Sequence, residues 1–188
     1  MPSIEPLPST GISKILGMCE ILEDKGGREE LFALARDMHM PFSEVLLVIK
    51  AAEMLSLIET PGHEAQITAF GQKVLAAGIK DKKVMLGQQM LKLNVFMHIV
   101  KLLKGTARNE LPAELILEEL AVRLPHETPR QMFTTLLNWG RYGDVFGYSR
   151  DTDLFFLHRE EAAAAATDRK STRLNSSHDE LSRMPSAA

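Results

Sequence analysis

The 188-residue chain has little of the chemistry that enzymes use. Its one cysteine, Cys19, excludes a disulfide within the chain and is typical of a reducing compartment. Its six histidines are scattered, whereas zinc and iron sites use closely spaced ligands. No G-x-x-x-x-G-K-[ST] phosphate loop is present, and solvated helix charge explains the acidic pairs Glu29-Glu30 and Glu118-Glu119. We therefore expect no catalytic residues, no metal and no cofactor in this chain.

Long apolar runs and an excess of positive charge are also missing. No stretch approaches the roughly 20 apolar residues that span a bilayer, and the first residues lack the pattern of a signal peptide. The formal net charge is −3 at pH 7, whereas nucleic-acid-binding domains normally carry a clear basic excess. These absences predict a cytoplasmic domain and disfavour a general nucleic-acid binder.

Apolar residues recur every three or four positions through most of the chain, which predicts a mainly α fold. In residues 10–80, three helices (the second about Arg28–Met38) precede two short strand-like segments around the turn Pro61-Gly62, which is the order of a winged helix. Residues 105–158 repeat this order. We predict two tandem winged-helix-like units, each of three helices and a short β-ribbon, joined by buried central helices in residues 81–104.

The two ends of the chain differ from this pattern. Residues 1–9 contain three prolines and no periodicity, which indicates a linker and the expectation that another segment precedes it. Residues 159–188 are expected to be a disordered tail. Within it, residues 168–188 are similar to a translated short-read sequencing adapter; a natural Ser/Arg-rich tail is the alternative. We exclude the tail from predictions of the fold.

The most distinctive stretch, Leu136–Tyr148, contains the one Trp and both Tyr of the protein. Tryptophan, tyrosine and arginine are the residue types enriched at the anchors of protein interfaces. The candidate interaction residues are therefore Trp139, Arg141, Tyr142 and Tyr148. The alternative is that Trp139 fills the core of the second unit and Arg141 pairs locally, because a lone tryptophan is often a core residue.

The sequence Asn138-Trp139-Gly140-Arg141-Tyr142, followed by Phe146-Gly147-Tyr148 and Asp151–Leu157, resembles the end of a known domain. This is the "AAA-associated" domain that follows the nucleotide-binding domain in ATP-binding subunits of nitrate/sulfonate/taurine-type ABC importers. The resemblance covers about residues 10–157. It implies an accessory domain for regulation or assembly, peripheral to the inner face of the cell membrane through the transporter complex and not inserted into the membrane.

The same resemblance implies partners and an absent part. The partners would be the nucleotide-binding and membrane subunits of the transporter, with a homodimer as a further option. ATP and Mg²⁺ would belong to the ATPase domain of the parent subunit, which this chain lacks, so we expect a fragment.

A winged-helix DNA-binding transcriptional regulator is the alternative function. Such proteins bind DNA through the third helix, and contacts with phosphates need several Lys or Arg on one face. The candidate helix Phe42–Leu55 has one base, Lys50, against Glu44 and Glu53. The corresponding helix of the second unit has Arg130, with Arg141 after it. These few basic residues disfavour binding of nucleic acid, and the DNA-binding regulator stays the alternative.

Overall fold

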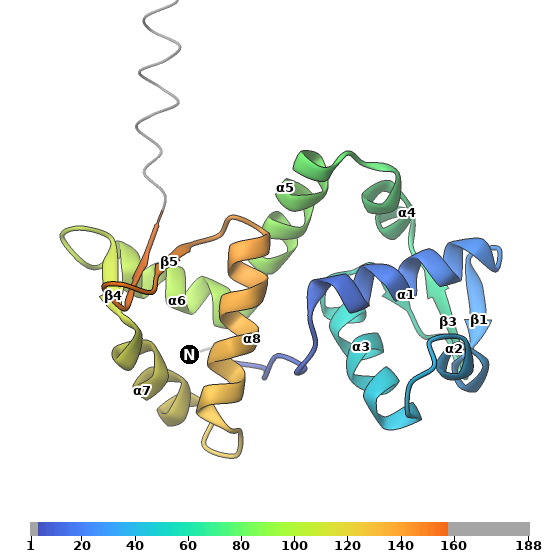
Figure 1. Ribbon diagram of the computed structural model, residues 1–188, viewed down its shortest axis with the longest axis horizontal. Coiled ribbons are helices and arrows are strands. Elements are labelled where there is room, and N and C mark those ends of the chain that lie inside the picture. Colours follow the sequence, from blue (N-terminus) through green and yellow to red (C-terminus); the bar gives the residue numbers. More distant parts are fainter. Residues whose placement is uncertain (1–3, 158–188) are drawn as a thin grey trace, which may run out of the picture. The chain divides into compact units, whose positions relative to one another are not determined.

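The computed structural model describes residues 4–157 (Figure 1). The predicted mainly helical fold is confirmed: this part of the chain has eight helices and two small antiparallel sheets of three strands each. No helix in it is both long and apolar enough to cross a membrane. The predicted tail of residues 159–188, with the adapter-like residues 168–188, lies outside the described residues.

The first half of this region follows the order helix, strand, helix, helix, strand, strand. Its elements are α1 (Ile12–Asp24), β1 (Arg28–Glu30), α2 (Leu31–Asp37), α3 (Phe42–Met54), β2 (Ile58–Glu59) and β3 (Glu64–Ile67). Strand β3 is the centre of the sheet, with β1 and β2 antiparallel on its two sides. Gly26 and Gly27 make the tight turn between α1 and β1. Both have a positive φ, which is unfavourable for residues with a side chain.

Strand β1 corrects the expected helix at Arg28–Met38 and the expected two-stranded ribbon. Residues 28–30 pair with residues 64–66, and Glu30 is the N-cap of α2, its side chain accepting the N–H of Ala33 at 3.0 Å. A carboxylate that accepts this N–H stabilises a helix start one residue after the strand. Glu29 and Glu30, which would fit the first turn of a helix, therefore lie in β1, directly before α2.

The second half repeats the same order of elements. They are α6 (Asn94–Lys104), β4 (Glu110–Pro112), α7 (Ala113–Arg123), α8 (Pro129–Tyr142), β5 (Gly147–Ser149) and β6 (Leu154–Phe156), and β6 is the central strand. Between the halves lie α4 (Ala69–Ala76) and α5 (Ile79–Met90). Helix α6, one of the expected buried central helices, is buried at Phe96 and Ile99, but Met97 is 45% exposed and Lys101 is exposed. Asn94 is the first residue of α6, and Leu93 has the cap position.

Helix α8 connects the two halves, because it packs against both α5 and α1. Gly87 of α5 allows this contact: a Cβ there would lie 2.2 Å from the carbonyl oxygen of Gly143 at the end of α8. The buried apolar residues form one continuous core that includes residues of both halves. The two repeats are therefore parts of one packed unit.

Candidate interaction site around Trp139

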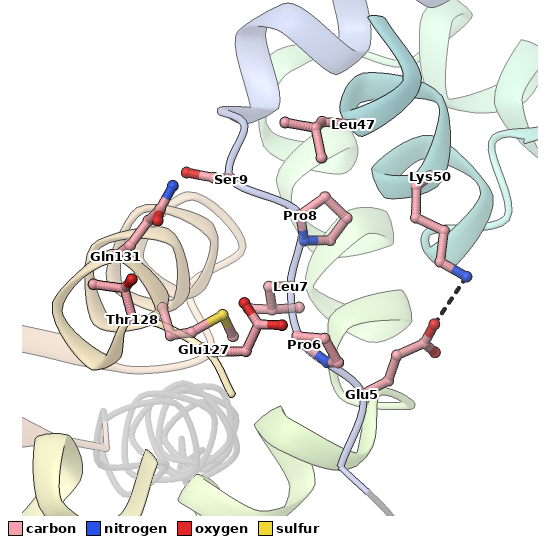
Figure 2. Close-up of a pocket in the computed structure, with 11 residues that line it drawn as sticks. Glu5, Pro6, Leu7, Pro8, Ser9, Leu47, Lys50, Glu127, Thr128 and Gln131 are labelled. Carbon is pink, nitrogen blue, oxygen red and sulfur yellow. Dashed lines mark ion pairs between the residues drawn. The ribbon is translucent and has the colours of Figure 1, made fainter. Parts of the chain in front are cut away.

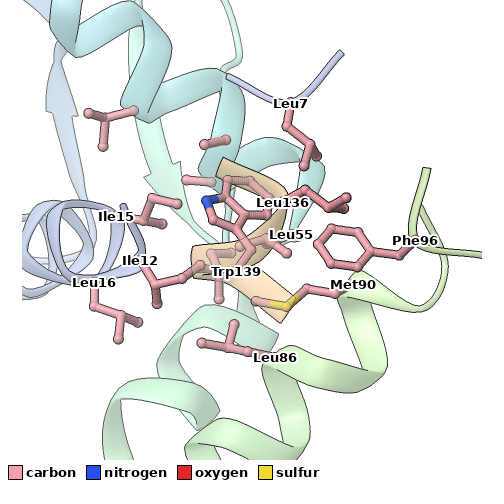
Figure 3. Packing of buried hydrophobic residues seen from close by; sticks show 14 of the residues in the cluster. Leu7, Ile12, Ile15, Leu16, Leu55, Leu86, Met90, Phe96, Leu136 and Trp139 are labelled. Atoms are coloured by element: carbon pink, nitrogen blue, oxygen red, sulfur yellow. The ribbon is translucent and has the colours of Figure 1, made fainter. Parts of the chain in front are cut away.

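Trp139 is fully buried, so its side chain is not part of the surface. Its indole Nε1–H donates to the carbonyl oxygen of Thr10 at 2.8 Å, across 129 positions of the sequence. Figure 3 shows the indole among apolar side chains of several elements, including Ile12 and Ile15 of α1 and Met90 of α5. Of the two interpretations of Trp139, the core interpretation holds, and that core joins the two halves.

The other three candidate residues have different surroundings. Arg141 is exposed, and among residues 4–157 it makes no ion pair, so the expected alternative of local pairing is not observed. Tyr142 is partly buried, and this burial raises its pKa. Because Trp139 is buried, the four residues do not form one exposed cluster. Arg141 and Tyr142 lie next to each other at the C-terminal end of α8.

Tyr148 of β5 belongs to an aromatic group within the second half. Its ring packs against Phe155 of β6, with centroids 5.2 Å apart, and against Phe133 of α8 at 6.3 Å. Its hydroxyl donates to Asp153 Oδ1 at 2.6 Å, and this hydrogen bond raises the pKa of Tyr148. These contacts join β5, the β5–β6 turn and β6. They give Tyr148, which is partly buried, a structural role.

A pocket of about 350 Å³ lies between the N-terminal segment, α3 and the start of α8 (Figure 2). Leu47 and Lys50 of α3 line it on one side, Thr128 and Gln131 on the other, and Glu5–Ser9 passes between them. Sequence patterns did not indicate this pocket, because proline-rich residues 1–9 were interpreted as a linker. In the structure Leu7 of this segment is only 3% exposed, and Glu5 forms an ion pair with Lys50 at 2.8 Å.

The third helix of each half has few basic side chains along the part of the chain that the structure describes. In α3, Lys50 is paired with Glu5, and the neighbouring exposed side chains Leu46 and Leu47 are apolar. In α8, the face that carries Leu136 and Trp139 is buried, and the two arginines lie near opposite ends of the helix. Neither helix presents the row of free cations that binding to a nucleic-acid backbone needs.

One acidic residue expected to be a solvated charge has a more specific place. Glu119 Oε1 of α7 accepts hydrogen bonds from Arg123 Nε and from His98 Nε2 of α6, both at 2.6 Å. The hydrogen bond from Arg123, supported by that from His98, lowers the pKa of Glu119. The side chains of His98 and Glu119 are largely covered, so this cluster joins α6 to α7 inside the second half.

The described residues offer little means for covalent or metal chemistry. Burial, with a smaller contribution from Glu20, raises the pKa of the Cys19 thiol to about 12, so the thiolate that acts as a nucleophile is scarce at neutral pH. Within residues 4–157 no three His, Cys, Asp or Glu side chains are grouped so that they could hold a metal ion.

A comparison with protein families gives a match. The family described as the C-terminal AAA-associated domain matches residues 32–149, which run from α2 to β5. The matched part contains Trp139 and the residues that follow it. No curated protein and no solved structure matches the chain.

Proposed function

The chain belongs to the family of C-terminal AAA-associated domains, and from this premise we propose that it is the accessory domain of an ATP-binding subunit of an ABC importer. The family match over residues 32–149 is the observation that carries the proposal. The resemblance of residues 138–157 to subunits of nitrate/sulfonate/taurine-type importers supports the transporter context and an anionic solute. In this proposal, a separate ATPase domain of the parent subunit holds ATP and Mg²⁺. The accessory domain lies at the inner face of the membrane because it is part of the transporter complex.

The role of the domain in this proposal is regulation or assembly through its surface. Arg141 is exposed, has no ion pair within the described region, and follows the buried Trp139 on the same helix. A neighbouring subunit that binds Arg141 and Tyr142 therefore contacts α8, which packs on both α1 and α5. Such a contact can favour one arrangement of the nucleotide-binding domains and so change the rate of ATP hydrolysis.

The test uses the complete importer in proteoliposomes, with its full ATP-binding subunit. We expect Arg141→Ala to weaken the contact between the subunits about tenfold or more, as truncation of an interface anchor does, and thereby to change solute-stimulated ATP hydrolysis. Arg130→Ala is the matched control, because Arg130 is an exposed arginine near the opposite end of α8. Equal regulation and equal subunit assembly in wild type, Arg141→Ala and Arg130→Ala would exclude the proposed contact.

A further inference from the structure

Charge is strongly segregated along this chain. Residues 65–109 contain eight basic residues and one acidic residue, Asp81, although the whole chain has a net charge of −3. The basic residues are Lys73, Lys80, Lys82, Lys83, Lys92, Lys101, Lys104 and Arg108. The middle of the chain is therefore cationic, between two acidic flanking regions. The total charge conceals this basic segment.

Three of these lysines lie with exposed aliphatic residues at the start of α5. Ile79, the first residue of the helix, is 79% exposed, and Val84 is 57% exposed. Ile79 lies one helical turn before Lys82 and Lys83, and Val84 lies one turn after Lys80, so each apolar side chain neighbours an ammonium group. We call Lys73–Val84 the α4–α5 corner, because α4 and α5 meet there through Ala77 and Gly78 (Figure 1).

The lysines of the corner are free to bind a partner. Lys73 and Lys80 are exposed, Lys82 and Lys83 are partly exposed, and none of the four makes an ion pair with another described residue. Asp81 is the acidic residue on the same turn. The buried face of α5, with Leu86, Gly87 and Met90, begins one turn further along the helix. Ile79, in the first turn of α5, is therefore largely exposed rather than packed.

We propose that the α4–α5 corner binds the surface of an anionic lipid membrane, with Ile79 and Val84 entering the headgroup region and the lysines contacting lipid phosphates. Opposite charge attracts basic segments to anionic leaflets, and a basic amphipathic helix end can bury its apolar side chains at that depth. The identity of the cations favours lipid over protein. Seven of the eight are lysine, which is depleted at protein interfaces, whereas arginine is enriched there.

This inference does not depend on the proposed function, because it concerns the chain alone and needs no parent subunit. The test is co-sedimentation of the full chain with vesicles of phosphatidylcholine that contain about a third phosphatidylglycerol. We expect binding to these vesicles, no binding to pure phosphatidylcholine, and weaker binding as salt increases toward about 0.15 M. The triple variant Lys80→Glu, Lys82→Glu, Lys83→Glu should lower the partition constant at least about 100-fold, at a factor of about five for each lysine removed.

A second variant separates the apolar contribution from charge. Ile79→Ser should weaken binding about tenfold and leave its salt dependence unchanged, since only buried aliphatic area is lost. The matched charge control is Lys14→Glu, Arg130→Glu, Arg150→Glu, which makes the same change of net charge at exposed positions outside residues 65–109. Far-UV circular dichroism confirms that each variant is folded.

Three results would overturn the proposal. One is a lack of binding to the anionic vesicles at low salt. Another is an equal loss of binding in the control variant, which would mean that net charge alone is responsible. The third is binding of duplex DNA, measured by fluorescence anisotropy, that is tighter than binding to the vesicles and is lost in the α5 triple variant.

Discussion

The indole of Trp139 contributes both packing and a long-range hydrogen bond. Trp139→Ala removes a fully buried large side chain at the contact between the two halves, and we expect it to lower the free energy of unfolding by about 4 kcal/mol. Trp139→Phe keeps most of the packing but leaves the Thr10 carbonyl without its donor, at a cost of about 1–2 kcal/mol. Urea denaturation followed by circular dichroism measures both values. Equal stability of Trp139→Phe and wild type would show that the hydrogen bond contributes nothing.

Because of Glu119, the protein should lose stability as the pH becomes acidic. Its hydrogen bonds from Arg123 and His98 lower its pKa in the folded state below the ordinary value of 4.5. A depressed pKa stabilises the fold above the ordinary pKa, and this stability is lost as the pH falls through the lower value of the folded protein. Glu119→Gln should therefore be less stable than wild type at pH 7, with the difference decreasing below about pH 4.5. A difference that stays constant from pH 7 to pH 3 would contradict this assignment.

The surroundings of these residues could be predicted from the sequence only in part. Trp139 was noticed because it is the one tryptophan, and a core position was an open alternative. Its partner Thr10 was beyond prediction, because 129 positions separate them and no local pattern encodes such a contact. Glu119 was interpreted as solvated because hydrogen bonds from another helix, such as that from His98, are equally non-local. Arg141 is exposed as an interaction residue must be.

At the scale of elements, the contact between α5 and α8 depends on a residue without a side chain. A Cβ on Gly87 would lie 2.2 Å from the Gly143 carbonyl oxygen, so Gly87→Ala must push α5 away from α8. We expect a loss of about 2–3 kcal/mol in the free energy of unfolding, which is typical of overpacking a tight contact. Gly17→Ala in α1 is the control: a Cβ there meets no atom within 4 Å, and alanine is the better helix former by about 1 kcal/mol. Similar stabilities of the two variants would contradict this account.

Helices were predictable from periodicity, but the first strand of each sheet was not. Strands β1 and β4 have three residues each and lead directly into α2 and α7, so no turn separates them from the helical pattern that follows. Their pairing partners β3 and β6 lie far along the chain, so the strands form because the sheet edge is available. Apolar spacing indicated helices in residues 81–104, but it could not show that Met97 of α6 is exposed, because this depends on which elements surround the helix.

For the whole molecule, the N-terminal segment joins the two repeats. Leu7 belongs to the common core, Thr10 accepts the hydrogen bond from Trp139, and Glu5 pairs with Lys50 of α3. Leu7→Ala should cost about 2–3 kcal/mol by opening a cavity in the core. Glu5→Gln should cost less than about 1 kcal/mol, because the Glu5–Lys50 pair is more than half exposed to solvent. Chemical denaturation of the two variants measures the difference, and equal costs would contradict the structural role of Leu7.

A continuous core has a consequence for cooperativity. If the two repeats were independent domains, each would unfold with its own midpoint, whereas elements that share buried side chains unfold together. Trp139 is the one tryptophan and lies where the repeats meet, so its fluorescence reports on the contact between them. Far-UV circular dichroism reports on all the helices.

We expect the two signals to give the same thermal midpoint at several protein concentrations, and Trp139 fluorescence to shift to longer wavelength in the same transition. A fluorescence change that precedes the loss of helix would show that the repeats separate before they unfold, and would place the weakest contact of the molecule between α8 and the helices α1 and α5.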